Sequence, residues 1–194
     1  YRHYRRTLYQ KSLELRSPFA VSVSPAAEKN EDVIEFLKAA GIRQTLVRLP
    51  SWERNDLSRY EEFCRLLRRE HSHVVADLLQ RREHVLDPAS WRLFLEDVFS
   101  RFSPFCSFFE IGHAWNRTKW GVWDHNEYID LALPAVSLAQ KYRVGLVGPA
   151  VIDFEFHLYP PTVSRLPFDK VSSLLYVDRV GPPESGQFGW TTAM

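Results

Sequence analysis

The chain has 194 residues, of which 45% are hydrophobic and 14% aromatic, enough apolar material for the packed core of one domain. Its formal net charge of +1 gives no electrostatic basis for binding nucleic acid or an anionic membrane surface. No run of about 18 apolar residues occurs, so no membrane span is expected. We therefore expect residues 1–194 to form a single domain or a fragment of a larger one.

The N-terminal segment and the cysteines indicate the compartment. The segment over about 1–16 is Arg-rich and amphipathic, which predicts a helix, and it lacks the apolar centre of a secretory signal. The two cysteines, Cys64 and Cys106, form no disulfide framework and have no metal-ligand spacing. We expect two buried free thiols in a reducing compartment, and hence a cytoplasmic protein.

Short apolar strands alternate with helical patterns along the chain. Strands are predicted, in chain order, at 18–24, 44–49, 72–79, 105–112, 144–151 and 171–177. Helices are predicted between them at 31–40, 57–69, 89–102 and 127–142. Asp87 and Pro88 predict the start of the third helix, because they supply a cap and a first-turn proline.

Strands separated by helices predict parallel pairing through right-handed crossovers. A doubly wound sheet and a barrel share this pattern. No glycine-rich phosphate loop follows the first strand, since residues 24–27 read Ser-Pro-Ala-Ala, and this argues against nucleotide binding. Polar and aromatic residues after the strands favour a parallel (β/α) TIM-barrel-like fold. About six βα units are present, whereas a closed barrel uses about 250 residues, so the barrel is expected to be incomplete. Its free strand edges would be covered by the N-terminal segment, by the C-terminal tail, by a further domain or by a second copy of the chain.

The segment 109–117 reads FEIGHAWNR, an apolar strand end followed by a polar and aromatic tip. It resembles the end of the fourth barrel strand in clan A glycoside hydrolases, which reads roughly Glu-Ile-x-Asn-Glu-Pro-Asn. Segments 47–49, 148–150 and 175–177 are similar to the second, fifth and sixth strands of that family. The resemblance implies a (β/α)8 barrel acting on carbohydrate. It also implies that Arg48 supports a catalytic carboxylate and that Tyr176 lies at the site.

The same resemblance implies that the best-known catalytic group is missing. The family's general acid/base position holds Ala114, which cannot carry a proton, and His113 stands in the place of the Asn. The family takes its nucleophile from a seventh strand, and no such strand is recognisable in this sequence. Retaining cleavage needs two carboxyl groups about 5–5.5 Å apart, so standard retaining catalysis is expected to be absent.

Two other residues are candidates for proton transfer. Glu110 lies four residues before Ala114, so it should point inward and about 13 Å deeper. We favour a buried carboxylate paired with an arginine such as Arg48; alternatively, desolvation raises its pKa and makes it an acid. His113 either shuttles a proton or binds a sugar hydroxyl group, or it is a hydrogen-bonded histidine at the rim.

Exposed tryptophan faces stack on sugar rings, and neighbouring amides and charges bind hydroxyl groups. The tryptophans after the fourth strand therefore predict a carbohydrate site, although hydrophobic cover of the barrel rim explains them equally well. The predicted substrate-binding residues are Arg48, Trp52, Trp115, Asn116, Lys119, Trp120, Tyr176 and Glu184.

No metal or cofactor is predicted. His113, His125, His157, Asp153 and Glu155 would be the candidate metal ligands, but their spacing matches no known metal motif. A barrel enzyme acting on a phosphorylated metabolite is a third possibility. Such barrels place the phosphate after strands seven and eight, which are not seen in this sequence.

The sequence therefore predicts a glycoside-hydrolase-like carbohydrate-active domain without standard retaining catalysis. The alternative is a non-catalytic carbohydrate-binding or scaffold protein derived from a glycosidase barrel. Whether the protein is an enzyme, hydrolysing O-glycosyl bonds, stays open at this point.

Overall fold

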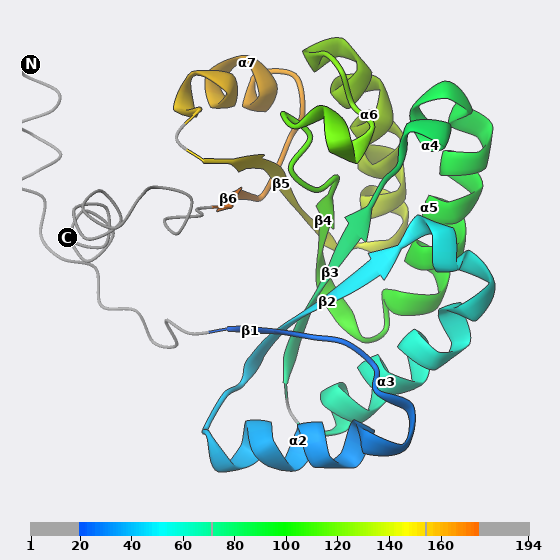
Figure 1. Cartoon of the computed structure of the whole chain (residues 1–194), viewed down its shortest axis with the longest axis vertical. Helices are drawn as coiled ribbons and strands as arrows, with labels where there is room; N and C mark the ends of the chain where they lie inside the picture. The colour runs from blue at the N-terminus through cyan, green and yellow to red at the C-terminus, as the bar shows by residue number, and fades with distance from the viewer. Residues whose placement is uncertain (1–19, 71, 154, 175–194) are drawn as a thin grey trace, which may run out of the picture.

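The computed structural model describes residues 20–70, 72–153 and 155–174, which form a curled parallel sheet with helices along its outer side (Figure 1). The strands are β1 (Val21–Val23), β2 (Gln44–Pro50), β3 (His73–Leu79), β4 (Cys106–Ile111), β5 (Gly145–Ile152) and β6 (Lys170–Leu174). Each strand pairs in parallel with the next one in the chain, in the order β1 to β6. This half-barrel confirms the predicted TIM-barrel-like α/β fold with about six βα units.

The helices follow the strands in alternation. They are α2 (Asn30–Ala39), α3 (Leu57–Arg69), α4 (Arg82–Leu86), α5 (Pro88–Phe102), α6 (His125–Tyr142) and α7 (Tyr159–Val163). Asp87 caps α5 as predicted, because its carboxylate accepts the N–H of Ser90. Helix α6 begins two residues before its predicted start, because the Asp124 carboxylate caps it from the preceding turn. The short helices α4 and α7 were not predicted.

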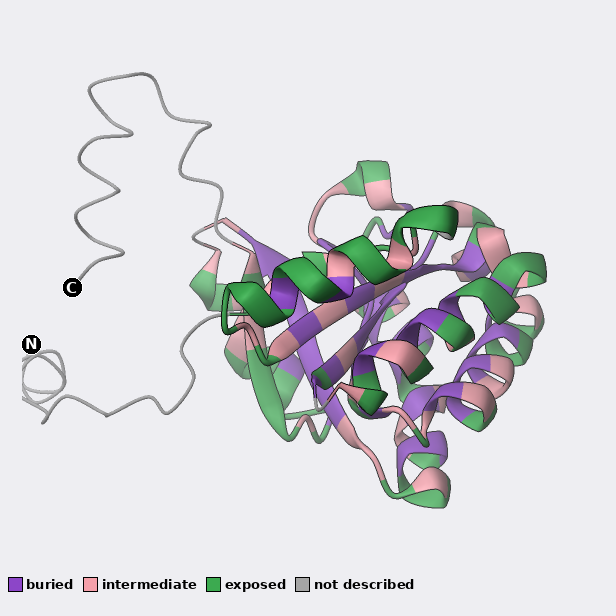
Figure 2. Ribbon diagram, turned by 90° about the horizontal axis from the view of Figure 1, so that it is seen from below, coloured by how far each residue is buried: buried purple, intermediate pink, exposed green. Residues whose placement is uncertain are grey.

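Residues alternate between the two faces of each strand. Val47 of β2, Ala76 of β3 and Phe109 of β4 are fully buried, and Phe109 stacks on Phe99 of α5 with ring centroids 4.4 Å apart. These side chains therefore face the helices and form the core, which is the buried centre of Figure 2. The neighbouring residues on each strand face the inner, concave side of the sheet.

Some predictions fall partly outside the described residues. The first and last strands were predicted at 18–24 and 171–177, and the described parts of them are shorter; residues 18–19 and 175–177 are outside, as is the helix predicted over about 1–16. Cys64 and Cys106 are buried and free, as predicted. Within the part of the chain that is described, no helix is long and apolar enough to cross a membrane.

Candidate functional site

Three charged side chains form a row across the inner face of the sheet. Arg48 of β2 is in register with Asp77 of β3, and Asp77 is in register with Glu110 of β4. Because parallel strands bring register partners side by side, the row is fixed by strand pairing. Arg48 Nε lies 3.6 Å from Asp77 Oδ2. Asp77 and Glu110 are almost completely buried, whereas the Arg48 side chain is 42% exposed.

Glu110 is a buried carboxyl group whose pKa is raised far above the ordinary value. Burial, and after it the negative charge of Asp77, raise the pKa of Glu110 to about 7, although a hydrogen bond from Ser172 and the charge of Arg48 act in the opposite direction. The prediction that Glu110 points inward and is buried agrees with the structure, but the arginine expected to pair with it lies against Asp77 instead. Near neutral pH, therefore, Glu110 exists in both protonated and ionised forms.

His113 approaches the row from the loop after β4. Its Nδ1 lies 3.4 Å from Asp77 Oδ2. The side chain of Gln80, which follows β3, holds the backbone of His113 from both sides: it accepts the His113 N–H at 2.8 Å and donates to the His113 carbonyl at 3.0 Å. This pair of bonds fixes the loop against the end of β3. Sequence reasoning missed Gln80, because a glutamine after a strand carries no motif.

Several buried polar atoms of this group are unsatisfied among the described residues. They are Arg48 Nε, Asp77 Oδ1, Glu110 Oε1 and His113 Nδ1. Buried polar atoms in proteins are nearly always hydrogen-bonded, so four exceptions within one contiguous cluster are unusual. One of the four is a donor and two are acceptors, while a histidine nitrogen takes either role. The cluster combines donors and acceptors of the kind that a polyhydroxyl ligand uses, and the half-exposed Arg48 side chain is its solvent-facing part.

The residues after His113 turn into the protein interior. Ala114 has a positive φ of 44° and is fully buried, and its carbonyl accepts the N–H of Arg117 at 2.9 Å. Trp115 is also buried, with its ring stacked on that of Tyr128 at 4.8 Å. The ring face predicted to stack on a sugar is thus covered by Tyr128. Of the two interpretations, hydrophobic cover describes Trp115 in this structure.

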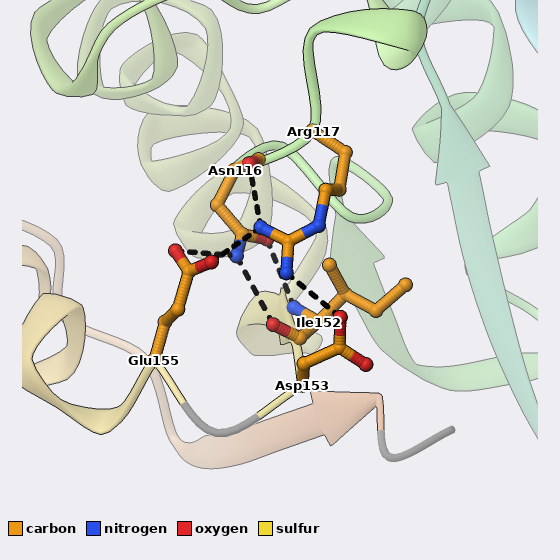
Figure 3. A network of polar contacts seen from close by, with 5 residues as sticks. All are labelled: Asn116, Arg117, Ile152, Asp153 and Glu155. Atoms are coloured by element: carbon orange, nitrogen blue, oxygen red, sulfur yellow. Dashed lines mark hydrogen bonds and ion pairs between the residues drawn. The ribbon is translucent and has the colours of Figure 1, made fainter. Parts of the chain in front are cut away.

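Asn116 and Arg117 connect the loop after β4 to the end of β5 (Figure 3). Asn116 accepts the N–H of Ile152 and donates both to the Ile152 carbonyl and to Glu155. Arg117 bridges Asp153 at 2.7 Å and Glu155 at 2.5 Å. The amide of Asn116, predicted to bind substrate, therefore already makes three hydrogen bonds within the protein, two of them to Ile152. Its side chain bonds both the N–H and the carbonyl of Ile152, as the backbone of a neighbouring strand would, and so extends the hydrogen bonding at the rim of the sheet.

Replacing Asn116 by alanine should destabilise the fold by about 2 kcal/mol, because the backbone N–H and carbonyl of Ile152 would lose their partner. Urea unfolding at constant pH measures the effect. Asn126→Ala is the matched control, since its exposed amide makes one surface bond to Arg165. An equal loss in the two variants would contradict a structural role for Asn116.

The other predicted rim residues lie at strand ends. Trp52 follows β2 and is 36% exposed, with the guanidinium of Arg81 3.9 Å from its ring centroid. Trp120 follows β4 and packs edge-on against the ring of His113, with centroids 4.5 Å apart. Lys119 is exposed beside Trp120. The structure thus brings these residues to the rim that carries the Asp77 cluster.

Two predicted binding residues, Tyr176 and Glu184, lie outside the described residues. The residues weighed as metal ligands do not gather: within 20–70, 72–153 and 155–174, no three His, Cys, Asp or Glu side chains are close enough together to hold a metal ion. His125 instead shares a hydrogen bond with Thr162 at 3.0 Å.

No protein-family model and no curated protein matches this sequence. Among solved structures, the chain resembles a D-psicose 3-epimerase in the presence of D-fructose, with a TM-score of 0.55 and 10% identity over 81% of this chain and 63% of that one. It also resembles the virulence factor SghA from Agrobacterium tumefaciens, with a TM-score of 0.50 and 11% identity over 64% of this chain and 36% of that one. A third likeness is to the pneumococcal virulence factor StrH, whose structure concerns N-glycan recognition and hydrolysis, with a TM-score of 0.50 and 9% identity over 88% of this chain and 62% of that one.

This chain spans less than two thirds of the length of each of these three structures. At such low identities the likeness establishes the fold alone. The chain therefore has a TIM-barrel-like α/β fold of the kind found in glycoside hydrolases and sugar epimerases.

Proposed function

We propose that this chain is a carbohydrate-active domain of glycoside-hydrolase type that binds a saccharide over the cluster of Arg48, Asp77, Glu110 and His113. The observation that carries the proposal is the set of unsatisfied buried polar atoms in this cluster. Sugar hydroxyl groups both donate and accept hydrogen bonds, so one ring can satisfy donors and acceptors together. The cluster lies toward the C-terminal ends of the strands, where barrels carry their sites.

The proposal includes the loss of standard retaining catalysis. Position 114 carries only a methyl group, and that group is fully buried, so nothing at this position transfers a proton. Glu110 is the residue best suited to replace it, since a carboxyl group with a pKa of about 7 can donate and accept a proton near neutral pH. His113, beside Asp77, is the second candidate for proton transfer.

The alternative is a non-catalytic carbohydrate-binding or scaffold protein, and Ala114 is the observation that favours it. Recognition of hydroxyl groups does not require the missing acid/base, so binding can persist after catalysis is lost. Incubating the full chain with aryl glycosides and oligosaccharides separates the two functions. Turnover that disappears in Glu110→Gln would support the enzyme, whereas binding without turnover would support the alternative.

Binding to a glycan array, followed by calorimetry on the best ligand, tests the shared part of the proposal. Asp77→Asn should weaken binding about tenfold or more, because Asp77 contacts both Arg48 and His113 and orients them. Glu35→Gln, on the exposed face of α2, is the control and should bind as the unaltered protein does. Unchanged affinity in a folded Asp77→Asn protein, or no glycan bound at all, would overturn the proposal.

A further inference from the structure

Two cation–tryptophan pairs lie on the rim beside the Asp77 cluster. In the first, the guanidinium of Arg81 stacks on Trp52, and no carboxylate among the described residues lies within ion-pair distance of it. In the second, Lys119 Nζ lies 5.8 Å from the ring centroid of Trp120, again without an ion-pair partner in the described part of the chain. Arg81 and Lys119 are both exposed. Each pair therefore presents, next to an aromatic ring, a positive charge without a close ion-pair partner among the described residues.

The two pairs belong to one surface because their loops are in direct contact. A Cβ at Gly121 would lie 2.2 Å from the backbone N of Arg82 and 2.6 Å from the carbonyl carbon of Arg81. Arg82 Nη1 also donates to the Gly121 carbonyl at 3.0 Å. The loop that carries Lys119 and Trp120 thus lies against the loop that carries Arg81. Trp120 in turn contacts His113, which connects the rim to the polar cluster below it.

The neighbouring Arg82 differs from Arg81 and Lys119, because its positive charge is paired within the protein. It forms a 2.6 Å ion pair with Glu127 and lies 3.8 Å from the ring centroid of Trp123. Its charge is already used to hold the loop to the start of α6. Within the described part of the chain, Arg81 and Lys119 lack such a partner, so their positive charges can be offered to a ligand.

Nearby acidic groups do not cancel these charges. Asp77 lies between Arg48 and His113. Glu110 is partly protonated near neutral pH. Glu53, the acidic residue that interacts electrostatically with Arg81, is already bonded to Tyr60 and Arg59. The positive charge of the rim above the cluster therefore comes from Arg81 and Lys119, because Arg48 already faces Asp77 at 3.6 Å.

We propose that the saccharide bound by this domain is anionic, with uronic acid residues whose carboxylates are held by Arg81 and Lys119 beside the rings of Trp52 and Trp120. This inference rests on the proposed carbohydrate function and specifies its ligand class. Tryptophan rings stack on the apolar face of a sugar, and arginine pairs with a carboxylate through two parallel N–H donors. A neutral sugar would use the rings and leave both charges without a function.

The test compares oligosaccharides containing uronic acid with the same oligosaccharides after reduction of their carboxyl groups, which keeps length and linkage and removes the charge. Pectic, alginate and glucuronan fragments serve as probes, with calorimetry on the full chain. We expect the acidic form to bind at least about tenfold more tightly than its reduced form. Raising the salt concentration should weaken binding of the acidic form alone.

Variants of Arg81 and Lys119 test whether these two residues cause the preference for the acidic saccharide. Arg81→Gln and Lys119→Gln should each reduce the affinity for the acidic form about tenfold and leave that for the reduced form nearly unchanged. Arg43→Gln is the matched control, because Arg43 is exposed and immediately precedes β2, at the opposite end of the strand from Trp52. An equal loss in Arg43→Gln would show an effect of net charge and overturn the inference.

The outcomes separate this inference from the function on which it rests. Equal binding of acidic and reduced saccharides, with loss of both in Asp77→Asn, would overturn the anionic ligand and keep the carbohydrate function. Absence of binding to every saccharide in the glycan array would overturn the carbohydrate function itself.

Discussion

Raising the pH from 5 to 8 should remove about 2.5 kcal/mol of the free energy of unfolding through Glu110 alone. The pKa of this residue is about 7 in the folded protein, against an ordinary value of 4.5. Because the folded-state pKa is the higher one, the folded state binds the proton more tightly than the unfolded chain does. The stabilisation is therefore complete below about pH 4.5 and is lost as the pH rises through 7.

The comparison of the unaltered protein with Glu110→Gln isolates this contribution. Glutamine is uncharged at every pH, so the variant should lack the fall in stability that Glu110 causes. His84 also changes the stability with pH, in the opposite direction, because burial lowers its pKa. Subtracting the stability of Glu110→Gln from that of the unaltered protein at each pH removes this contribution. Urea unfolding from pH 5 to 8 measures both proteins, with Glu35→Gln as the control.

The variant Asp77→Asn tests what raises the pKa of Glu110. Burial is the larger cause and the charge of Asp77 the second, so this variant should lower the pKa of Glu110 only part of the way to its ordinary value. Carboxyl carbon NMR follows the titration of Glu110 directly. A pKa near 4.5 in the unaltered protein would contradict the burial of this side chain, and with it the role proposed for Glu110 in proton transfer.

The fold was largely predictable because its signals are local. Alternation of apolar strands with amphipathic helices predicted the parallel order, and α3 has the bounds that its helical spacing indicated. The helices α4 and α7 were missed because five residues are too few to show a helical period, and their formation depends on the surrounding chain. The register between strands depends on the pairing of distant segments and has no local signal, so the sequence did not predict that Arg48 lies beside Asp77.

The site was harder to predict because burial is a property of the tertiary structure. Trp115 and Trp120 lie five residues apart and carry identical side chains, yet one is stacked within the core on Tyr128 and the other lies on the rim against His113. Asn116 resembled a binding residue but holds the backbone of Ile152. Arg81 was missed because its importance comes from its position over Trp52 and from the absence of an ion-pair partner among the described residues.

Replacing Gly121 by alanine should destabilise the protein by about 4 kcal/mol, through two separate effects. Gly121 has a φ of +88°, a conformation that side chains other than glycine rarely adopt. The added Cβ would also lie 2.2 Å from the backbone N of Arg82, and no rotation of a flexible side chain relieves that contact. The loops that carry Arg81 and Trp120 would have to separate.

Gly41→Ala separates the two effects, because Gly41 has a similar φ of +67° and no atom within 4 Å of its added Cβ. It should cost only about 1 kcal/mol, from backbone strain alone. The difference between the two variants in urea unfolding then measures the contact between the loops. If both variants lost the same stability, Gly121 would have room for a side chain. The contact that holds the two cation–tryptophan pairs on one surface would then be absent. The proposal that both pairs bind the same acidic saccharide would lose its support.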